Sequence, residues 1–324
     1  MIDDSEPFTL LSISSPTTIN LCRDLKENPS LPTIFIASYP KSGTTWLQAI
    51  VATLLYDNLN NLNHRDESSS FKHISDVSPF FEVDRTWNDE NIIQPAITSV
   101  HEKIGYRVFN THLWWEMLPQ GASFKYLYIV RDGKDAVLSF YHHLSHQAEG
   151  NYEGSFDNFL DDWCEGKIPF GKWITHLKKW YEAFSSDSNN NKCLMLRYES
   201  LVNDLPGEVE KISNFLFKDS VVDNDLNSIS SSRIKIEKLC ESLSFQGMRR
   251  ESARYQPVSV TWLDNFQFLR KGCVGDNLSF FTPEQHRKFD QMVEKAFTII
   301  SEGSSHTDIP DWFKELNIYK KYEE

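Results

Sequence analysis

Residues 38–50, "SYPKSGTTWLQAI", decide how this chain folds. They directly follow the apolar run Thr33–Ala37, which has the length of a buried strand, and they lead into Thr44–Tyr56, whose apolar residues recur with helical period. A loop between a strand and the start of a helix presents unpaired backbone N–H groups at the positive end of the helix dipole. Because the loop also holds a lysine, a glycine and several hydroxyl side chains, it predicts an anion-binding site.

The loop is similar to a phosphate-binding P-loop, but the order of its residues differs. A Walker loop reads G-x-x-x-x-G-K-[ST], with the lysine after the second glycine. Here Lys41 precedes Gly43, and Ser38 stands where the first glycine would be. A glycine-containing turn with a serviceable N-cap is the plain alternative. Trp46, in the first turn of the helix, lies either in the core or, beside a phosphate, against an adenine ring.

Short apolar runs that alternate with helical segments predict the fold class. Four runs have the length of buried strands: Thr33–Ala37, Tyr106–Phe109, Lys125–Val130 and Lys192–Leu196. Segments with helical period follow or separate them: Thr44–Tyr56, Gly133–Leu144, Trp173–Phe184 and Gly207–Phe217. This alternation is typical of parallel strands joined by crossover helices. We therefore predict a single α/β domain with a central, mainly parallel sheet flanked by helices and a P-loop-like binding loop.

The remaining segments are assigned by composition. The polar stretches 57–70 and 185–192 predict surface loops. Helices are expected to dominate beyond Arg233, among them one over 282–297 with a threonine N-cap and proline at its first position. We expect residues 1–30 to form an N-terminal extension that is packed on the domain or flexible, 31–305 the domain, and 306–324 a C-terminal tail.

The charge balance and the cysteines restrict the classes of partner. With 46 acidic against 33 basic residues the net charge is −13, which disfavours nucleic acid and anionic membranes as partners. The five cysteines are scattered and form no C-x-x-C pair, as expected for reduced thiols rather than a disulfide framework or a zinc site. The acidic N-terminus is unlike a signal peptide, and no stretch of about 20 apolar residues occurs. A soluble cytoplasmic protein is the prediction.

Two further strand ends carry residues suited to chemistry. Arg131 stands at the carboxyl end of the strand within 125–143, and Ser139 lies two turns into the following helix. An arginine fork suits a phosphate dianion, although an arginine beside an aspartate is often only an ion pair. His112 ends another predicted strand, within 107–119, at the sheet edge that binds ligands in open α/β folds. A histidine there is either structural or a general base for a hydroxyl or amine nucleophile.

Taken in order along the chain, these motifs resemble the cytosolic sulfotransferase family. Members of that family transfer a sulfonate from 3′-phosphoadenosine 5′-phosphosulfate (PAPS) to a hydroxyl or amine. The resemblance covers about residues 30–300 and rests on "YPKSGTTW" (39–46), "SPFFE" (78–82), "NTHLWWEMLP" (110–119), "YIVRDGKDAVLSFYHH" (128–143), "GSFDNFLDDWCEGKIPFGKWITHLKKWYE" (154–182) and "FLRKG" (268–272).

The resemblance implies roles for individual residues. His112 would take the proton of the acceptor, Lys41 would stabilise charge on the bridging oxygen of the leaving nucleotide, and Ser139 completes the implied catalytic set. PAPS would be held by Lys41, Ser42, Gly43, Thr44, Thr45, Trp46, Arg131, Ser139, Tyr198, Ser244, Phe245, Met248, Arg270, Lys271 and Gly272. No metal is implied, since a sulfonate carries less charge than a phosphoryl group and lysine and helix amides can supply the electrostatic stabilisation.

Some positions depart from the family pattern. Leu243 replaces a threonine, Leu278 a lysine and Asn110 a lysine that often precedes the Thr-His pair in animal members. Pro283 and Arg287 stand where the family's dimerisation segment has valine and glutamate. The resemblance therefore implies a monomer or a weak homodimer.

The acceptor is predicted only by class. Phe80, Phe81, Trp87, His112 and Phe140 suggest a pocket for a small aromatic or apolar molecule, although several of these rings could belong to the core. Glu82 and Asp84 could favour an amine, although exposed acids are the default in an acidic protein. Two other functions stay open at this point: a kinase that uses ATP and Mg²⁺, and a non-catalytic nucleotide-binding relic.

Overall fold

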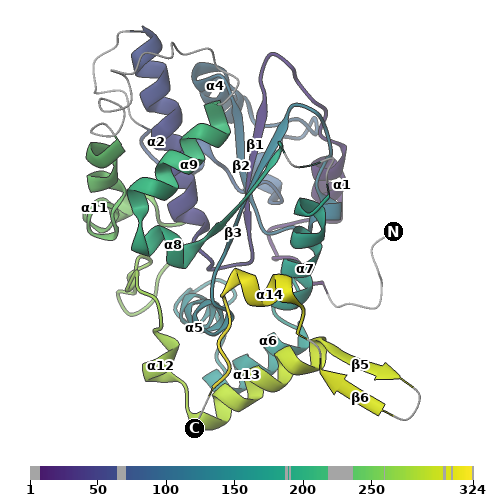
Figure 1. The fold of residues 1–324 in the computed structure, drawn as a ribbon. Coiled ribbons are helices and arrows are strands. Elements are labelled where there is room, and N and C mark those ends of the chain that lie inside the picture. Colours follow the sequence, from purple (N-terminus) through teal and green to yellow (C-terminus); the bar gives the residue numbers. More distant parts are fainter. Residues whose placement is uncertain are drawn as a thin grey trace.

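A computed structural model describes residues 8–63, 71–186, 189, 191–217, 236–258, 260–301, 304–307 and 309–322. Within these residues the central sheet has four parallel strands in the order β2-β1-β3-β4 (Figure 1). The strands are β1 Thr33–Ser38, β2 Arg107–Thr111, β3 Phe124–Val130 and β4 Cys193–Arg197. The predicted α/β fold with a parallel sheet is confirmed.

Alternating side chains of β1 divide the core into two layers. Phe35 packs against Phe109 and Tyr126 of the neighbouring strands on one face. Ile34 and Ile36 belong to the other layer, which α2 and α9 cover (Figure 1). The helices are α1 Pro16–Asp24, α2 Thr44–Asn63, α3 Ile74–Val77, α4 Pro95–Ile104, α5 Gly133–Leu144, α6 Phe156–Glu165, α7 Trp173–Phe184, α8 Tyr198–Asn203, α9 Leu205–Phe217, α11 Phe245–Arg250, α12 Asn277–Phe280, α13 Pro283–Ala296 and α14 Asp311–Leu316.

The predicted strands and helices are present in the structure, although most of them begin or end at different residues. Two segments differ from the prediction. Helix α2 continues to Asn63, so the first half of the stretch 57–70, predicted as a loop, is helical. That half contains neither glycine nor proline to end the helix, and residues 64–70 lie outside the described part. The antiparallel pair β5 Thr298–Ser301 and β6 Ser304–Thr307 was not predicted. Of the loop predicted over 185–192, residues 187, 188 and 190 lie outside the described part. Ser185 is the C-cap residue of α7.

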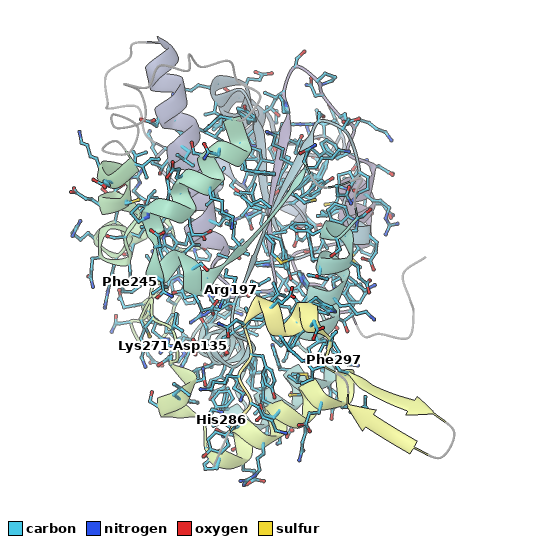
Figure 2. The ribbon with its side chains drawn as sticks, viewed as in Figure 1. Asp135, Arg197, Phe245, Lys271, His286 and Phe297 are labelled. Atoms are coloured by element: carbon cyan, nitrogen blue, oxygen red, sulfur yellow. The ribbon has the colours of Figure 1, made fainter. Side chains whose placement is uncertain are left out.

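The first and last helices of the described residues, α1 and α14, pack on the rest of the domain. Ile19 and Cys22 of α1 and Phe313 of α14 are buried in the hydrophobic core. Figure 2 shows His286 on α13, where its ring stacks on Tyr322 with centroids 4.6 Å apart. Helix α13 begins with the predicted threonine cap: the Thr282 hydroxyl accepts the Gln285 N–H, and the Gln285 side-chain oxygen accepts the Thr282 N–H. The division into extension, domain and tail stays a prediction. In the described residues, no helix is long and apolar enough to cross a membrane.

Candidate active site

A cavity of about 580 Å³ opens at the carboxyl ends of the sheet strands. It is lined by the β1–α2 loop, the end of β2, α5, the start of α8, α11 and the segment 268–273. The residues of the predicted site that line it are Phe80, His112, Phe140, Lys41, Gly43, Thr44, Thr45, Trp46, Arg131, Ser139, Tyr198, Phe245, Met248, Arg270, Lys271 and Gly272. The fold therefore brings together segments that are far apart in the sequence.

Four residues of the predicted site do not line this cavity. Ser42, a residue of the β1–α2 loop, is buried. The Ser244 hydroxyl caps α11 by accepting the Gly247 N–H. Phe81 and Trp87, predicted to line the acceptor pocket, lie instead in the hydrophobic core, where the Trp87 indole donates to the Phe81 carbonyl at 3.0 Å. Neighbouring side chains in this extended segment point in opposite directions. Because Phe80 points toward the cavity, Phe81 points into the core.

The β1–α2 loop adopts a conformation that favours glycine. Gly43 has a φ of 109°, and a Cβ added there would lie 2.8 Å from the ring of Tyr198. Lys41 also has a positive φ, 66°, which brings its carbonyl to Arg131. Among the described residues the buried Ser42 hydroxyl has no hydrogen-bond partner. A buried donor beside the first turn of a helix fits an anionic ligand.

The Lys41 ammonium lies among aromatic rings and other cations. Its Nζ is 3.2 Å from Nδ1 of His143 and 4.5 Å from the ring centre of Phe268. Burial, together with the charges of Arg131 and Arg270, lowers the pKa of Lys41 to about 7. Burial and the Lys41 charge hold the pKa of His143 well below its ordinary value, so its neutral ring accepts the bond from lysine. His143 was not among the predicted site residues, although it stands in the run "FYHH" (140–143).

His112 is fixed on three sides. Its Nδ1 donates to the Ser38 carbonyl at 2.7 Å, and its backbone N–H donates to Glu82 at 2.6 Å. Its carbonyl accepts Nε2–H of His176 at 3.0 Å, while the Tyr128 hydroxyl donates to the other nitrogen of that ring. Burial lowers the pKa of His112 to about 4, the bond to Ser38 opposes the shift and Lys41 adds to it. The ring is therefore neutral near pH 7 with its proton on Nδ1, and Nε2 carries a lone pair.

The structure corrects the expectation that Glu82 is a surface acid. Glu82 is fully buried, and this burial raises the pKa of its carboxyl group to about 8 although His112 and Thr111 donate to it. Asp84 is exposed and accepts bonds from the Thr18 hydroxyl and the Ser15 N–H at the start of α1. Glu82 thus positions His112, and Asp84 anchors α1.

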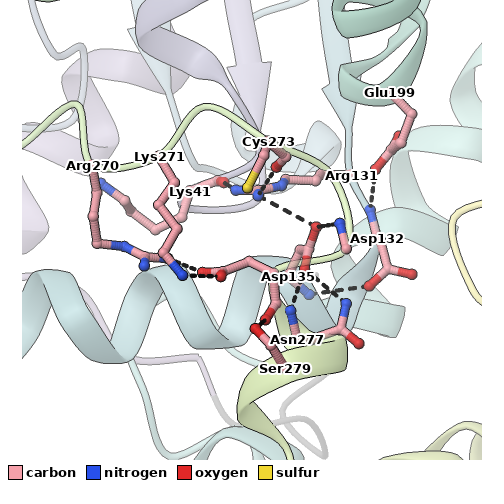
Figure 3. Close-up of polar contacts among 12 residues, drawn as sticks. Lys41, Arg131, Asp132, Asp135, Glu199, Arg270, Lys271, Cys273, Asn277 and Ser279 are labelled. Carbon is pink, nitrogen blue, oxygen red and sulfur yellow. Dashed lines mark hydrogen bonds and ion pairs between the residues drawn. The ribbon is translucent and has the colours of Figure 1, made fainter.

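A network of cations and carboxylates forms the far end of the cavity (Figure 3). The Arg131 guanidinium donates to the Lys41 and Cys273 carbonyls, both at 3.2 Å, and lies 4.4 Å from the ring centre of Tyr198. Arg270 and Lys271 both form an ion pair with Asp276. Three cationic side chains therefore converge on one region, as a phosphate dianion requires.

Aromatic rings enclose the space between this network and the β1–α2 loop. Trp46 and Tyr198 pack edge to face with ring centroids 5.6 Å apart, and the Trp46 indole donates to the Leu243 carbonyl at 2.7 Å. Gly272 has a φ of 63°, and a Cβ there would come within 2.1 Å of Phe245. Leu243 itself is buried, so the hydroxyl that the family pattern has at this position is replaced by core packing.

These features define a site suited to an anionic ligand at the carboxyl ends of a parallel sheet, and the comparisons identify the kind of enzyme. The sulfotransferase domain family model matches residues 31–301. Sulfotransferase 1E1 of Homo sapiens is 31% identical over 270 residues, which cover 81% of this chain and 82% of that protein. The amine sulfotransferase of Oryctolagus cuniculus is 27% identical over 81% of this chain and 79% of its own. The chain belongs to the sulfotransferase family and is a sulfonate-transferring enzyme; a kinase is not favoured.

Solved structures agree with this fold. Mouse sulfotransferase SULT7A1, crystallised with PAP, aligns with a TM-score of 0.66 at 24% identity over 97% of both chains. Retinol dehydratase in complex with androsterone and the inactive cofactor PAP aligns with a TM-score of 0.62 at 19% identity, over 86% of this chain and 84% of its own.

Proposed function

We propose that this sulfotransferase transfers the sulfonate of PAPS to a hydroxyl or amine of a small aromatic or apolar acceptor, with His112 as the general base. The observation that carries the proposal is the orientation of His112. Its Nδ1–H is bonded to the Ser38 carbonyl, which leaves the Nε2 lone pair as the basic nitrogen of a ring that lines the same cavity as Lys41. A neutral histidine in this state can accept a proton from an acceptor group.

The residues of the cavity suit the parts of PAPS. The β1–α2 loop would hold the 5′-phosphosulfate through Lys41, Gly43, Thr44 and Thr45, which line the cavity. Arg131, Arg270 and Lys271 would hold the 3′-phosphate. The adenine would bind between these two ends, against Met248 and the aromatic rings of Trp46, Tyr198 and Phe245. Bound PAPS supplies an activated sulfonate at the end of the cavity that contains His112.

Lys41 and His112 would then act at opposite ends of the transfer. His112 takes the proton of the attacking hydroxyl or amine at Nε2, and the Lys41 ammonium stabilises negative charge on the bridging oxygen of the departing nucleotide. Ser139, which lines the cavity one turn before His143 on α5, is proposed to assist at the phosphate groups. Anions bound beside Lys41 and His112 raise the pKa of both groups, which restores the lysine charge and strengthens the base.

The acceptor end of the cavity is apolar. Phe80 and Phe170 pack edge to face on the His112 ring, with centroids 5.3 and 5.1 Å away. Phe140, Ile168 and the N-terminal residues 10–13 line the cavity with them. Such walls favour a flat apolar acceptor. We propose that the protein acts as a monomer or weak homodimer in the cytoplasm, where the free thiols of its five cysteines are typical.

The test is detection of product by mass spectrometry. Purified protein is incubated with PAPS, EDTA and a mixed panel of phenols, steroids, alcohols and amines. A sulfonated product, formed by the wild type and reduced at least ~100-fold in His112→Asn, supports the proposal. If PAP binds but no member of a broad panel is sulfonated, the proposed acceptor class is wrong. If ATP binds in preference to PAP, the proposed donor is wrong.

A further inference from the structure

Two of the three cations assigned to the 3′-phosphate already share one carboxylate of the protein. Arg270 and Lys271 each donate to a different oxygen of Asp276, which lines the same cavity (Figure 3). The Asp276 side chain is only 5% exposed, whereas those of Arg270 and Lys271 are 24% and 51% exposed. The carboxylate is therefore more buried than the two cations, which stay accessible to a ligand in the cavity.

The backbone on both sides of Asp276 is fixed, so this carboxylate has little freedom to move away. The Asp135 carboxylate on α5 accepts the Gly275 N–H at 2.8 Å and the Asn277 N–H at 3.0 Å. It also accepts the Asn277 side-chain amide at 2.7 Å (Figure 3). Asp135 thus holds the residues before and after Asp276 against the helix that follows Arg131.

Asp276 is charged in this state. Burial alone would raise the pKa of its carboxyl group, but the hydrogen bonds and charges of Lys271 and Arg270 outweigh it and leave the pKa below its ordinary value. A phosphate that binds the same guanidinium and ammonium groups brings a dianion next to a fixed carboxylate. Two like charges that share the same donors repel each other and divide the available hydrogen bonds.

We propose that Asp276 is an internal counter-ion of the 3′-phosphate site, which weakens the binding of the product nucleotide and so promotes its release. The proposal rests on the function proposed above. Without a ligand, Asp276 balances one of the two positive charges of Arg270 and Lys271 and keeps both side chains in place. With PAP bound, it limits the affinity that Arg131, Arg270 and Lys271 would otherwise give. A nucleotide without a 3′-phosphate leaves the ion pairs undisturbed.

The experiment measures nucleotide affinity by calorimetry for the wild type and Asp276→Asn, which keeps the size of the side chain and removes its charge. The ligands are PAP and adenosine 5′-monophosphate, which lacks the 3′-phosphate. Asp161→Asn is the matched control. Asp161 lies on α6, also forms an ion pair with a lysine (Lys288 of α13, at 2.7 Å) and does not line the cavity. Asp276→Ser is a second neutral variant, made in case the asparagine variant fails to fold.

The proposal predicts that Asp276→Asn binds PAP about tenfold more tightly than the wild type, with the affinity for adenosine 5′-monophosphate unchanged. The control should bind both ligands as the wild type does. Unchanged or weaker PAP binding by folded Asp276 variants overturns the proposal, because it would show that the carboxylate only orients the cations. A wild type that does not bind PAP contradicts the proposed function itself, which separates the two failures. In stopped-flow displacement, PAP should leave Asp276→Asn more slowly than it leaves the wild type.

Discussion

The charge state of Lys41 makes the affinity for PAP depend on pH above neutrality. In the ligand-free protein, burial and the charges of Arg131 and Arg270 lower the pKa of Lys41 to about 7. Above that pH the free protein holds a neutral amine, whereas a bound anion favours the ammonium form. Binding of PAP then requires uptake of a proton. Each further pH unit therefore lowers the affinity for PAP by up to about tenfold. Because half of Lys41 is already neutral at pH 7, the loss between pH 7 and pH 9 should approach about 50-fold.

The assay is the dissociation constant of PAP at constant ionic strength from pH 6 to pH 9.5, compared with Lys41→Arg and Lys41→Met. Arginine keeps its charge throughout this range, so Lys41→Arg should lack the decline. Lys41→Met should bind weakly with no such slope. Asp132, the neighbour of Arg131, could also titrate in this range, because burial raises its pKa to about 7. The two variants separate this effect from that of Lys41, because Asp132 is present in both. A wild type with constant affinity from pH 7 to pH 9, or Lys41→Arg with the same decline as the wild type, would refute the reasoning.

Three further predictions concern the other parts of the site. His112→Asn can keep a donor toward the Ser38 carbonyl but has no basic nitrogen, so kcat should fall by ~10²–10⁴-fold while calorimetry finds PAP affinity little changed. Arg131→Lys loses the planar guanidinium fork, so its affinity for PAP should fall by about tenfold while its affinity for adenosine 5′-monophosphate hardly changes. An equal loss of affinity for both ligands would disprove a contact between Arg131 and the 3′-phosphate. Glu82→Gln tests the buried acid. Because the folded-state pKa of Glu82 is raised to about 8, its stabilising contribution is complete below its ordinary pKa of 4.5 and is lost as the pH rises through about 8. The Tm of the wild type should therefore fall relative to Glu82→Gln between pH 5 and pH 9, and parallel Tm curves would count against this pKa.

Local patterns were sufficient to predict the elements that frame the site. Helix α5 begins and ends at the predicted residues, Gly133 and Leu144, because the Asp132 carboxylate caps its N-terminus and its apolar residues face the core. The strand–loop–helix at 33–50 was predicted from an equally local pattern: a short apolar run, a loop that contains Gly43 and a helix with periodic apolar residues follow each other directly. Each of these signals lies within about 15 residues of sequence.

Contacts between distant segments were beyond such patterns. The pairing of Asp276 with Arg270 and Lys271, and its fixation by Asp135, depend on how the segment 268–277 returns to α5. The burial of Glu82 follows from the packing of its segment against β2, since nothing in the run "SPFFEVD" separates a buried acid from an exposed one. His143 meets Lys41 only because α5 passes beside the β1–α2 loop. Tertiary packing thus decided what the sequence pattern left open.

The most direct test of this account is the stoichiometry of the reaction. Once an acceptor is found, PAP and sulfonated product are quantified together over time for the wild type in EDTA. We expect the two to form in equal amounts, and both to fall together in His112→Asn and Lys41→Met. Release of PAP without sulfonated product, or transfer that survives unchanged in both variants, would contradict the assignment of this cavity as the active site.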